Sequence, residues 1–206
     1  MLEDYTSSGI PFDPPQVRVD RLEESLRIIR PLLRGESVSY EGQHYNVANL
    51  IGNPAPLQKP HPPILIGAGG KRMLALAARE ADIVGIAPPA LPQGGIDLDI
   101  GAPAVAAQVE FFRAKAGERI NSIELQMLNQ FLEVTDDPLG AAERKALEWD
   151  LPTSTITDSP HVLIGTVDSL VETLLERRER YGFSYIIVRP PVMEAFAPVV
   201  ARLNGA

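Results

Sequence analysis

The stretch from Ile64 to Arg72 carries the residue types best suited to binding a ligand. It runs Ile-Leu-Ile-Gly-Ala-Gly-Gly-Lys-Arg, so an apolar segment leads into three glycines and then two cations. A buried strand followed by small residues and a helix start is typical of an anion-binding turn, because glycine lets backbone N–H groups approach a ligand closely. The unpaired N–H groups and the dipole of the helix's first turn also favour negative charge. The pattern predicts phosphate binding here, with Lys71 and Arg72 adding positive charge.

Two well-known phosphate-binding motifs do not match this turn. The dinucleotide pattern G-x-G-x-x-G fails at Arg72, and the P-loop pattern fails because Gly70-Lys71 is followed by arginine. On local sequence alone, a tight strand-to-helix turn in which glycine only relieves crowding is an equally good interpretation. Both interpretations stay open at this point.

Two further segments could contribute to a site. The loop from Ala87 to Gly101 is rich in proline and glycine and follows a predicted strand, where active-site loops lie in a barrel. Its Asp97 and Asp99 lack a fuller ligand set, so a solvated loop is favoured over a metal site. Arg189 directly follows the last predicted strand, and it either points into the mouth of a site or forms an ion pair at the rim.

Metal binding and nucleophilic catalysis have little support in this sequence. His44, His61 and His161 are scattered, no cysteine is present, and no G-x-S-x-G segment nominates a serine. We interpret the histidines as structural or surface residues, and we assign no catalytic acid or base. The charged run 176–180 is interpreted as a solvated helix face with internal ion pairs.

Apolar periodicity predicts the elements that would position these segments. A hairpin is expected at 37–45, and four core strands are expected at 63–66, 82–86, 123–127 and 184–188, the first of them buried on both faces. Helices are expected at 17–34, 73–80, 103–116, 138–149, 167–181 and 194–203. Strands alternating with helices indicate an α/β fold with a parallel sheet. Four strands cannot close a barrel of eight, so the sheet is open or half of a barrel is missing.

Composition restricts the class of protein. The 206 residues carry a formal net charge of -8, which argues against nucleic acid as a partner, because phosphate-backbone binders need an excess of Lys and Arg. The absence of cysteine excludes a disulfide framework and fits a cytoplasmic location. No stretch approaches the ~20 apolar residues that span a bilayer, so no membrane partner is expected.

Several stretches together resemble one known family. They are Gly9–Phe12, Arg18–Glu24, Tyr40–Tyr45, Pro62–Gly70, Ala77–Asp82, Ile164–Leu170 and Tyr181–Phe183. Their order is similar to that of the luciferase-like monooxygenases, a family that includes many deazaflavin-dependent (coenzyme F420) oxidoreductases. The resemblance covers nearly the whole chain and leans toward the deazaflavin-using branch.

The resemblance implies a fold, a cofactor and a reaction class. The fold would be the C-terminal half of a (β/α)8 TIM barrel, with 1–206 a single luciferase-like domain lacking the N-terminal strands. The protein would be an oxidoreductase or monooxygenase in which a reduced cofactor transfers hydride on a small organic substrate. Gly67, Ala68, Gly69, Gly70 and Lys71 would hold the cofactor phosphate. Coenzyme F420 is the first choice and FMN the alternative. Many FMN-using relatives have serines at the end of this turn, where Lys71 and Arg72 stand here, so this departure does not decide between the two cofactors.

Other interpretations compete with a complete enzyme. The chain resembles a truncated gene product, an excised piece or one member of a split enzyme. A half-barrel exposes two strand edges and an apolar face, so it should form a homodimer or pair with a complementary half-barrel. The alternative to an enzyme is a non-catalytic cofactor-binding or scaffold protein, which would pair in the same way. An unrelated open sheet with a phosphate ligand has the same local patterns.

Overall fold

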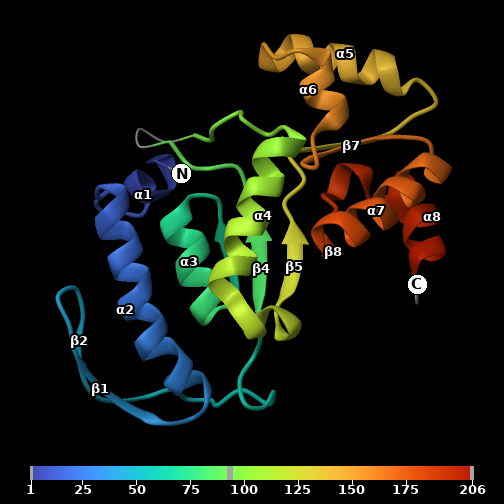
Figure 1. Cartoon of the computed structure of the whole chain (residues 1–206). Coiled ribbons are helices and arrows are strands. Elements are labelled where there is room, and N and C mark those ends of the chain that lie inside the picture. Colours follow the sequence, from blue (N-terminus) through green and yellow to red (C-terminus); the bar gives the residue numbers. More distant parts are fainter. Residues whose placement is uncertain (1, 92–94, 205–206) are drawn as a thin grey trace.

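A four-stranded parallel sheet forms the centre of the protein (Figure 1). In this computed structural model, which describes residues 2–91 and 95–204, the strand order is β3-β4-β5-β8. The strands are β3 (Leu65–Ala68), β4 (Ile83–Ile86), β5 (Glu124–Met127) and β8 (Phe183–Ile186). They are the four predicted core strands, with ends displaced by one or two residues. The predicted α/β fold with a parallel sheet is therefore confirmed.

Helices cover one face of this sheet. They are α2 (Pro15–Leu33), α3 (Lys71–Glu80), α4 (Ala102–Ala116), α7 (Val167–Tyr181) and α8 (Met193–Leu203). The main core lies between these helices and the sheet, where Leu74, Phe112 and Met127 are fully buried. The predicted limits of α7 are confirmed, because the Thr166 side chain accepts a hydrogen bond from the Ser169 N–H at its start.

The other face of the sheet is open at its two edge strands, although Gln126 of the inner strand β5 is only 2% exposed. Strand register aligns Gly67, Gly85, Gln126 and Tyr185 in one row on that face. Leu65 is 44% exposed and Tyr185 is 38% exposed. The expectation that the first strand is buried on both faces is therefore wrong, because β3 is an edge strand and a Cβ atom on Gly67, on its second face, would meet nothing within 4 Å. Within the same part of the chain, β8 has an unpaired edge as well.

The predicted hairpin consists of antiparallel strands β1 (Ser37–Glu41) and β2 (Asn46–Ile51). Its second strand begins later than expected, because residues 43–45 form the turn. The Glu24 carboxylate of α2 accepts hydrogen bonds from all three of their backbone N–H groups, at 2.9–3.1 Å. Partial desolvation acts to raise the pKa of Glu24, but these three hydrogen bonds outweigh it and lower the pKa.

A smaller module was not fully predicted. Parallel strands β6 (Phe131–Val134) and β7 (Val162–Gly165) form a second sheet, and α5 (Pro138–Trp149), which was expected, and α6 (Thr153–Asp158) lie between them in the chain. Helix α1 (Leu2–Ser7) was also unforeseen. The strands escaped prediction because runs of four residues show no clear period. Figure 1 shows α5 and α6 at the end of the molecule toward which β4 and β5 point.

Arg177 corrects the interpretation of the charged run in α7. Its side chain is buried, and it donates hydrogen bonds to the carbonyls of Ser159, Pro160 and Val162 at 2.8–3.0 Å. Burial lowers its pKa to about 10. The helical period places position 177 on the inward stripe of α7, which overrides its charge. The Glu176–Arg180 pair is at the surface, at 3.6 Å, as predicted.

Among the residues described, no helix combines the length and the apolar character that crossing a bilayer requires.

Candidate cofactor-binding site

The segments singled out in the sequence lie along the carboxyl edge of the parallel sheet. The glycine turn follows β3, the loop beginning at Ala87 follows β4, and Arg189 lies just beyond β8. Asn129, which the sequence analysis did not single out, lies just beyond β5. In parallel α/β proteins, ligands bind at this edge, because the loops that leave the strand ends converge there. The strand order puts the glycine turn beside the Ala87 loop and places Arg189 at the far end of the sheet.

The glycine turn presents an uncapped helix N-terminus. Helix α3 begins at Lys71, no acidic side chain lies in its first turn, and Gly70 occupies the N-cap position without a side chain to cap it. The first-turn N–H groups therefore lack intrahelical acceptors. A Cβ atom built on Gly67 or Gly70 would meet nothing within 4 Å. These two glycines leave open space in which an anion could approach the backbone.

Gly69 has a different role. A Cβ atom there would lie 2.6 Å from the Ala87 carbonyl oxygen and 2.7 Å from that of Pro88. The turn and the loop are joined by Gln108 of α4, whose Nε2 donates to the Gly69 oxygen at 2.9 Å and to the Ala87 oxygen at 3.0 Å. Gly69 thus relieves crowding between the turn and the loop, whereas the open space beside Gly67 and Gly70 suits a ligand.

Sequence reasoning missed Gln108, although a signal was present. Val105, Val109 and Phe112 form the buried stripe of α4, and Gln108 is the polar residue that interrupts it. A polar side chain on an inward stripe needs a hydrogen-bond partner, which here is the backbone of the site.

The two cations after the glycines separate. Arg72 is directed to α2, where it pairs with the Asp20 carboxylate and donates to the Gln16 carbonyl at 3.1 Å. The prediction that both cations serve the same anion therefore needs correction, because Arg72 is engaged elsewhere. Lys71 is exposed, with Nζ 6.0 Å from the centre of the Phe111 ring, and no carboxylate within the described ranges pairs with it.

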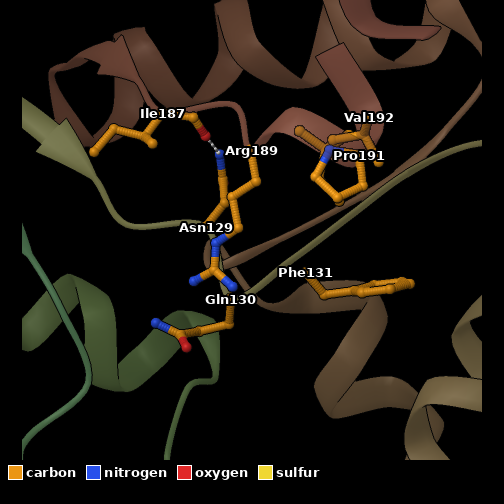
Figure 2. Close-up of a pocket in the computed structure, with 8 residues that line it drawn as sticks. Asn129, Gln130, Phe131, Ile187, Arg189, Pro191 and Val192 are labelled. Carbon is orange, nitrogen blue, oxygen red and sulfur yellow. Dashed lines mark hydrogen bonds between the residues drawn. The ribbon is translucent and has the colours of Figure 1, made fainter. Parts of the chain in front are cut away.

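A cavity of about 150 Å³ lies at the other end of the same edge. Asn129, Gln130, Phe131 and Arg189 contribute to its walls, and Figure 2 shows the Arg189 side chain extending into it. Asn129 Nδ2 donates to the Ile187 carbonyl at 3.0 Å, which joins the ends of β5 and β8. Of the two predicted roles for Arg189, the structure favours the one in which it points into a site, since it forms no ion pair with any described residue.

His161 contacts the backbone of the segment 128–130, which contributes to the wall of this cavity. It is fully buried, its Nδ1 lies 2.9 Å from the Leu128 carbonyl oxygen, and its own carbonyl accepts the Gln130 N–H at 2.8 Å. Desolvation lowers the pKa of His161, so the ring is neutral at physiological pH. His161 is thus structural, in agreement with the sequence interpretation.

The remaining polar candidates make local contacts. His61 Nδ1 is 2.8 Å from the Pro62 carbonyl oxygen, and His44 belongs to the hairpin turn. The Asp97 carboxylate accepts the Asp99 N–H at 3.0 Å, a local turn contact. Residues 92–94 of the predicted loop lie outside the described residues. In the parts that are described, no three His, Cys, Asp or Glu side chains are grouped so that they could hold a metal ion.

Comparison with known sequences identifies the family of this chain. The family model for luciferase-like monooxygenases matches residues 3–121. The F420-dependent glucose-6-phosphate dehydrogenase of Microbacterium testaceum is 39% identical over 74 residues, which cover 36% of this chain and 21% of that protein. The enzyme of the same name from Nakamurella multipartita is 33% identical over 122 residues, which cover 58% of this chain and 33% of that one. The matches thus span a third or less of these relatives.

Solved structures show the same fold. The EDTA monooxygenase EmoA from Chelativorans sp. BNC1 superposes with a TM-score of 0.67 at 16% identity, covering 97% of this chain and 62% of that one. An F420-dependent secondary alcohol dehydrogenase superposes with a TM-score of 0.65 at 16% identity, covering 92% and 62%. The chain belongs to the luciferase-like monooxygenase family, and its sheet and helices correspond to part of that family's TIM barrel.

Proposed function

We propose that this chain supplies the phosphate-anchoring part of the cofactor site in a deazaflavin-dependent oxidoreductase. The observation that carries the proposal is the uncapped N-terminus of α3, which has open space beside Gly67 and Gly70 and an unpaired Lys71. The names of the curated relatives, which are F420-dependent dehydrogenases, support the choice of cofactor.

Different groups of the turn would have different roles in binding the cofactor. Backbone N–H groups at the start of α3 donate hydrogen bonds to phosphate oxygens, and Lys71 neutralises the charge. Gly69 keeps the turn packed against the Ala87 loop, which would cover a small organic substrate. The bound deazaflavin would supply hydride transfer, while the protein orients it and excludes water.

FMN is the alternative cofactor. Structures similar to this chain include a riboflavin lyase with modified FMN, at a TM-score of 0.66 and 14% identity. FMN ends in a phosphate monoester that approaches two negative charges at neutral pH, whereas the phosphodiester of coenzyme F420 carries one. The single unpaired cation at the turn, Lys71, matches the phosphodiester better.

A second candidate function is a non-catalytic cofactor-binding or scaffold protein. The open sheet face, with Leu65 and Tyr185 exposed, and the unpaired edges of β3 and β8 favour it. Such a half-barrel, with 1–206 as one domain, would be covered by a second copy or by a complementary half-barrel. Light scattering of the purified chain, alone and with candidate partners, would detect such pairing, and a monomer that remains stable alone would argue against it.

A fluorescence titration tests the proposal. Purified protein is titrated with oxidised and reduced coenzyme F420 and with FMN, and the wild type is compared with Gly70→Asp. Saturable F420 binding that the substitution strongly weakens would support the phosphate turn. Failure of the wild type to bind either cofactor would overturn the oxidoreductase assignment for this chain.

A further inference from the structure

A second cavity, with apolar and charged residues in its walls, lies away from the sheet edge. It has a volume of about 280 Å³, opens to the surface, and is lined by residues of α1, of α2, of the segment between these helices and of the turn of the β1–β2 hairpin. Figure 1 shows α1 at the N-terminal end of α2 and the hairpin beside α2. Arg18 and Ser25 of α2 line the cavity, whereas Gln16 and Asp20 of α2 contact Arg72. These two pairs lie about half a turn apart at 100° per residue, so the cavity and the glycine turn are on opposite sides of the helix.

Arg18 is the unbalanced charge of this cavity. Its guanidinium lies over the Phe12 ring, 4.2 Å from the centroid, and Phe12 in turn meets the Tyr5 ring edge-on at 5.1 Å. No carboxylate pairs with Arg18 in the described part of the chain, and its buried Nε has no hydrogen-bond acceptor. Buried polar groups are nearly always hydrogen-bonded, so such an atom calls for a missing partner.

The second arginine of the cavity is already neutralised. Arg21 Nε lies 3.2 Å from a carboxylate oxygen of Asp13. The pair contributes no net charge, which leaves Arg18 to attract an anion. A stacked guanidinium keeps its N–H edge free for a planar, bidentate acceptor such as a carboxylate.

The other residues that line the cavity indicate the chemical character of the rest of the ligand. Ile10 and Leu22 provide apolar surface, and Tyr5 and Tyr45 provide rings with hydroxyl groups. Tyr45 is held in place because Glu24 accepts its backbone N–H at 3.1 Å. The volume of about 280 Å³ is roughly nine times the ~30 Å³ that one water molecule occupies, which exceeds the need of a lone inorganic ion.

We propose that this cavity binds a small organic acid, with its carboxylate on Arg18 and its hydrocarbon body between Ile10, Leu22 and the tyrosine rings. The proposal does not depend on cofactor binding at the glycine turn, because the two places share no residue. It adds a ligand site to the chain that the cofactor proposal does not need.

Calorimetric titration with benzoate tests this proposal, with benzamide as the uncharged analogue and inorganic phosphate as the compact anion. Wild type and Gly70→Asp should bind benzoate equally, and Arg18→Gln should bind it at least tenfold more weakly. Tyr5→Glu, which keeps Arg18 but adds a carboxylate to the same cavity, should weaken binding to a similar extent. Thermal unfolding of each variant establishes that it is folded.

Other outcomes would overturn the assignment. Equal binding of benzoate and benzamide would show that charge is not recognised. Unchanged affinity in both Arg18→Gln and Tyr5→Glu would place the ligand elsewhere, and phosphate binding without benzoate binding would exclude an organic acid. Loss of benzoate binding in Gly70→Asp would assign the anion to the glycine turn.

Discussion

Replacing Gly70 with aspartate should strengthen the fold while it removes phosphate binding. Gly70 is the N-cap of α3 in an extended conformation, with φ -79° and ψ 153°, and nothing lies within 4 Å of a Cβ atom there. An aspartate fits without strain and can accept a hydrogen bond from the first turn. Capping contributes a few tenths of a kcal/mol over glycine, and the helix dipole adds about 0.3–1 kcal/mol. We expect a gain of about 0.5–1 kcal/mol, or roughly 1–4 °C in Tm for a chain of this size.

The same carboxylate should repel the phosphate. Two unit charges 4 Å apart at an effective dielectric constant near 20 repel by about 4 kcal/mol, and by about 2 kcal/mol at 8 Å. Affinity for coenzyme F420 should therefore fall by roughly 30-fold to 1,000-fold. Stability and affinity thus change in opposite directions, which a damaged fold would not produce.

Gly70→Asn provides the matched control. Asparagine caps a helix about as well as aspartate but carries no charge, so this variant should be stabilised and should keep most of its affinity. Thermal unfolding by circular dichroism and fluorescence titration with F420 measure the two quantities. The reasoning is refuted if Gly70→Asp binds F420 as the wild type does, or if it is less stable than the wild type.

Three further comparisons test the packing and the hydrogen bonds described above. Gly69→Ala should lower the free energy of unfolding, measured in urea, by about 1–3 kcal/mol, because its Cβ atom would meet the backbone of the loop after β4. Gly70→Ala should leave the free energy of unfolding nearly unchanged. Equal losses in the two variants would contradict this packing. Arg177→Met should lower the free energy of unfolding by about 3–5 kcal/mol, since it leaves three buried carbonyls without their hydrogen-bond donor. Arg180→Met at the surface should change the same free energy by no more than about 0.5 kcal/mol. A small loss in Arg177→Met would disprove the role of these hydrogen bonds. Because the pKa of Glu24 is lowered in the folded chain, its stabilisation is present above the unfolded pKa and lost as pH falls through the folded pKa. Amide exchange in the hairpin turn should therefore accelerate in acid for the wild type relative to Glu24→Gln, and identical profiles for the two proteins would rule this out.

The local elements could be predicted from the sequence because their signals are local. Apolar runs located the four core strands, and Thr166 and Gly182 marked the ends of α7. Hydrophobic periodicity reports which face of an element is buried. It also located the strand-to-helix turn at Gly67–Lys71, since a glycine cluster between a strand and a helix is visible without any partner.

The short strands β6 and β7 show where such signals fail. Each has four residues, too few to display a period, and each is defined by pairing with the other across the α5–α6 segment. The edge position of β3 also depends on its neighbours, since the same apolar run would suit a strand covered on both faces.

The sequence by itself determined the α/β class, the order of the four core strands and of the helices between them, and the place of the glycine turn. Only the tertiary structure decided what each polar residue of that turn does: Gly69 is crowded by a loop, Gly70 is open, Arg72 pairs with α2 and Lys71 is left unpaired. The same holds for Arg177, whose charge suggests solvent. The physical reason is that a helical or strand period specifies the direction of a side chain, whereas its partner comes from a distant segment that only folding brings near.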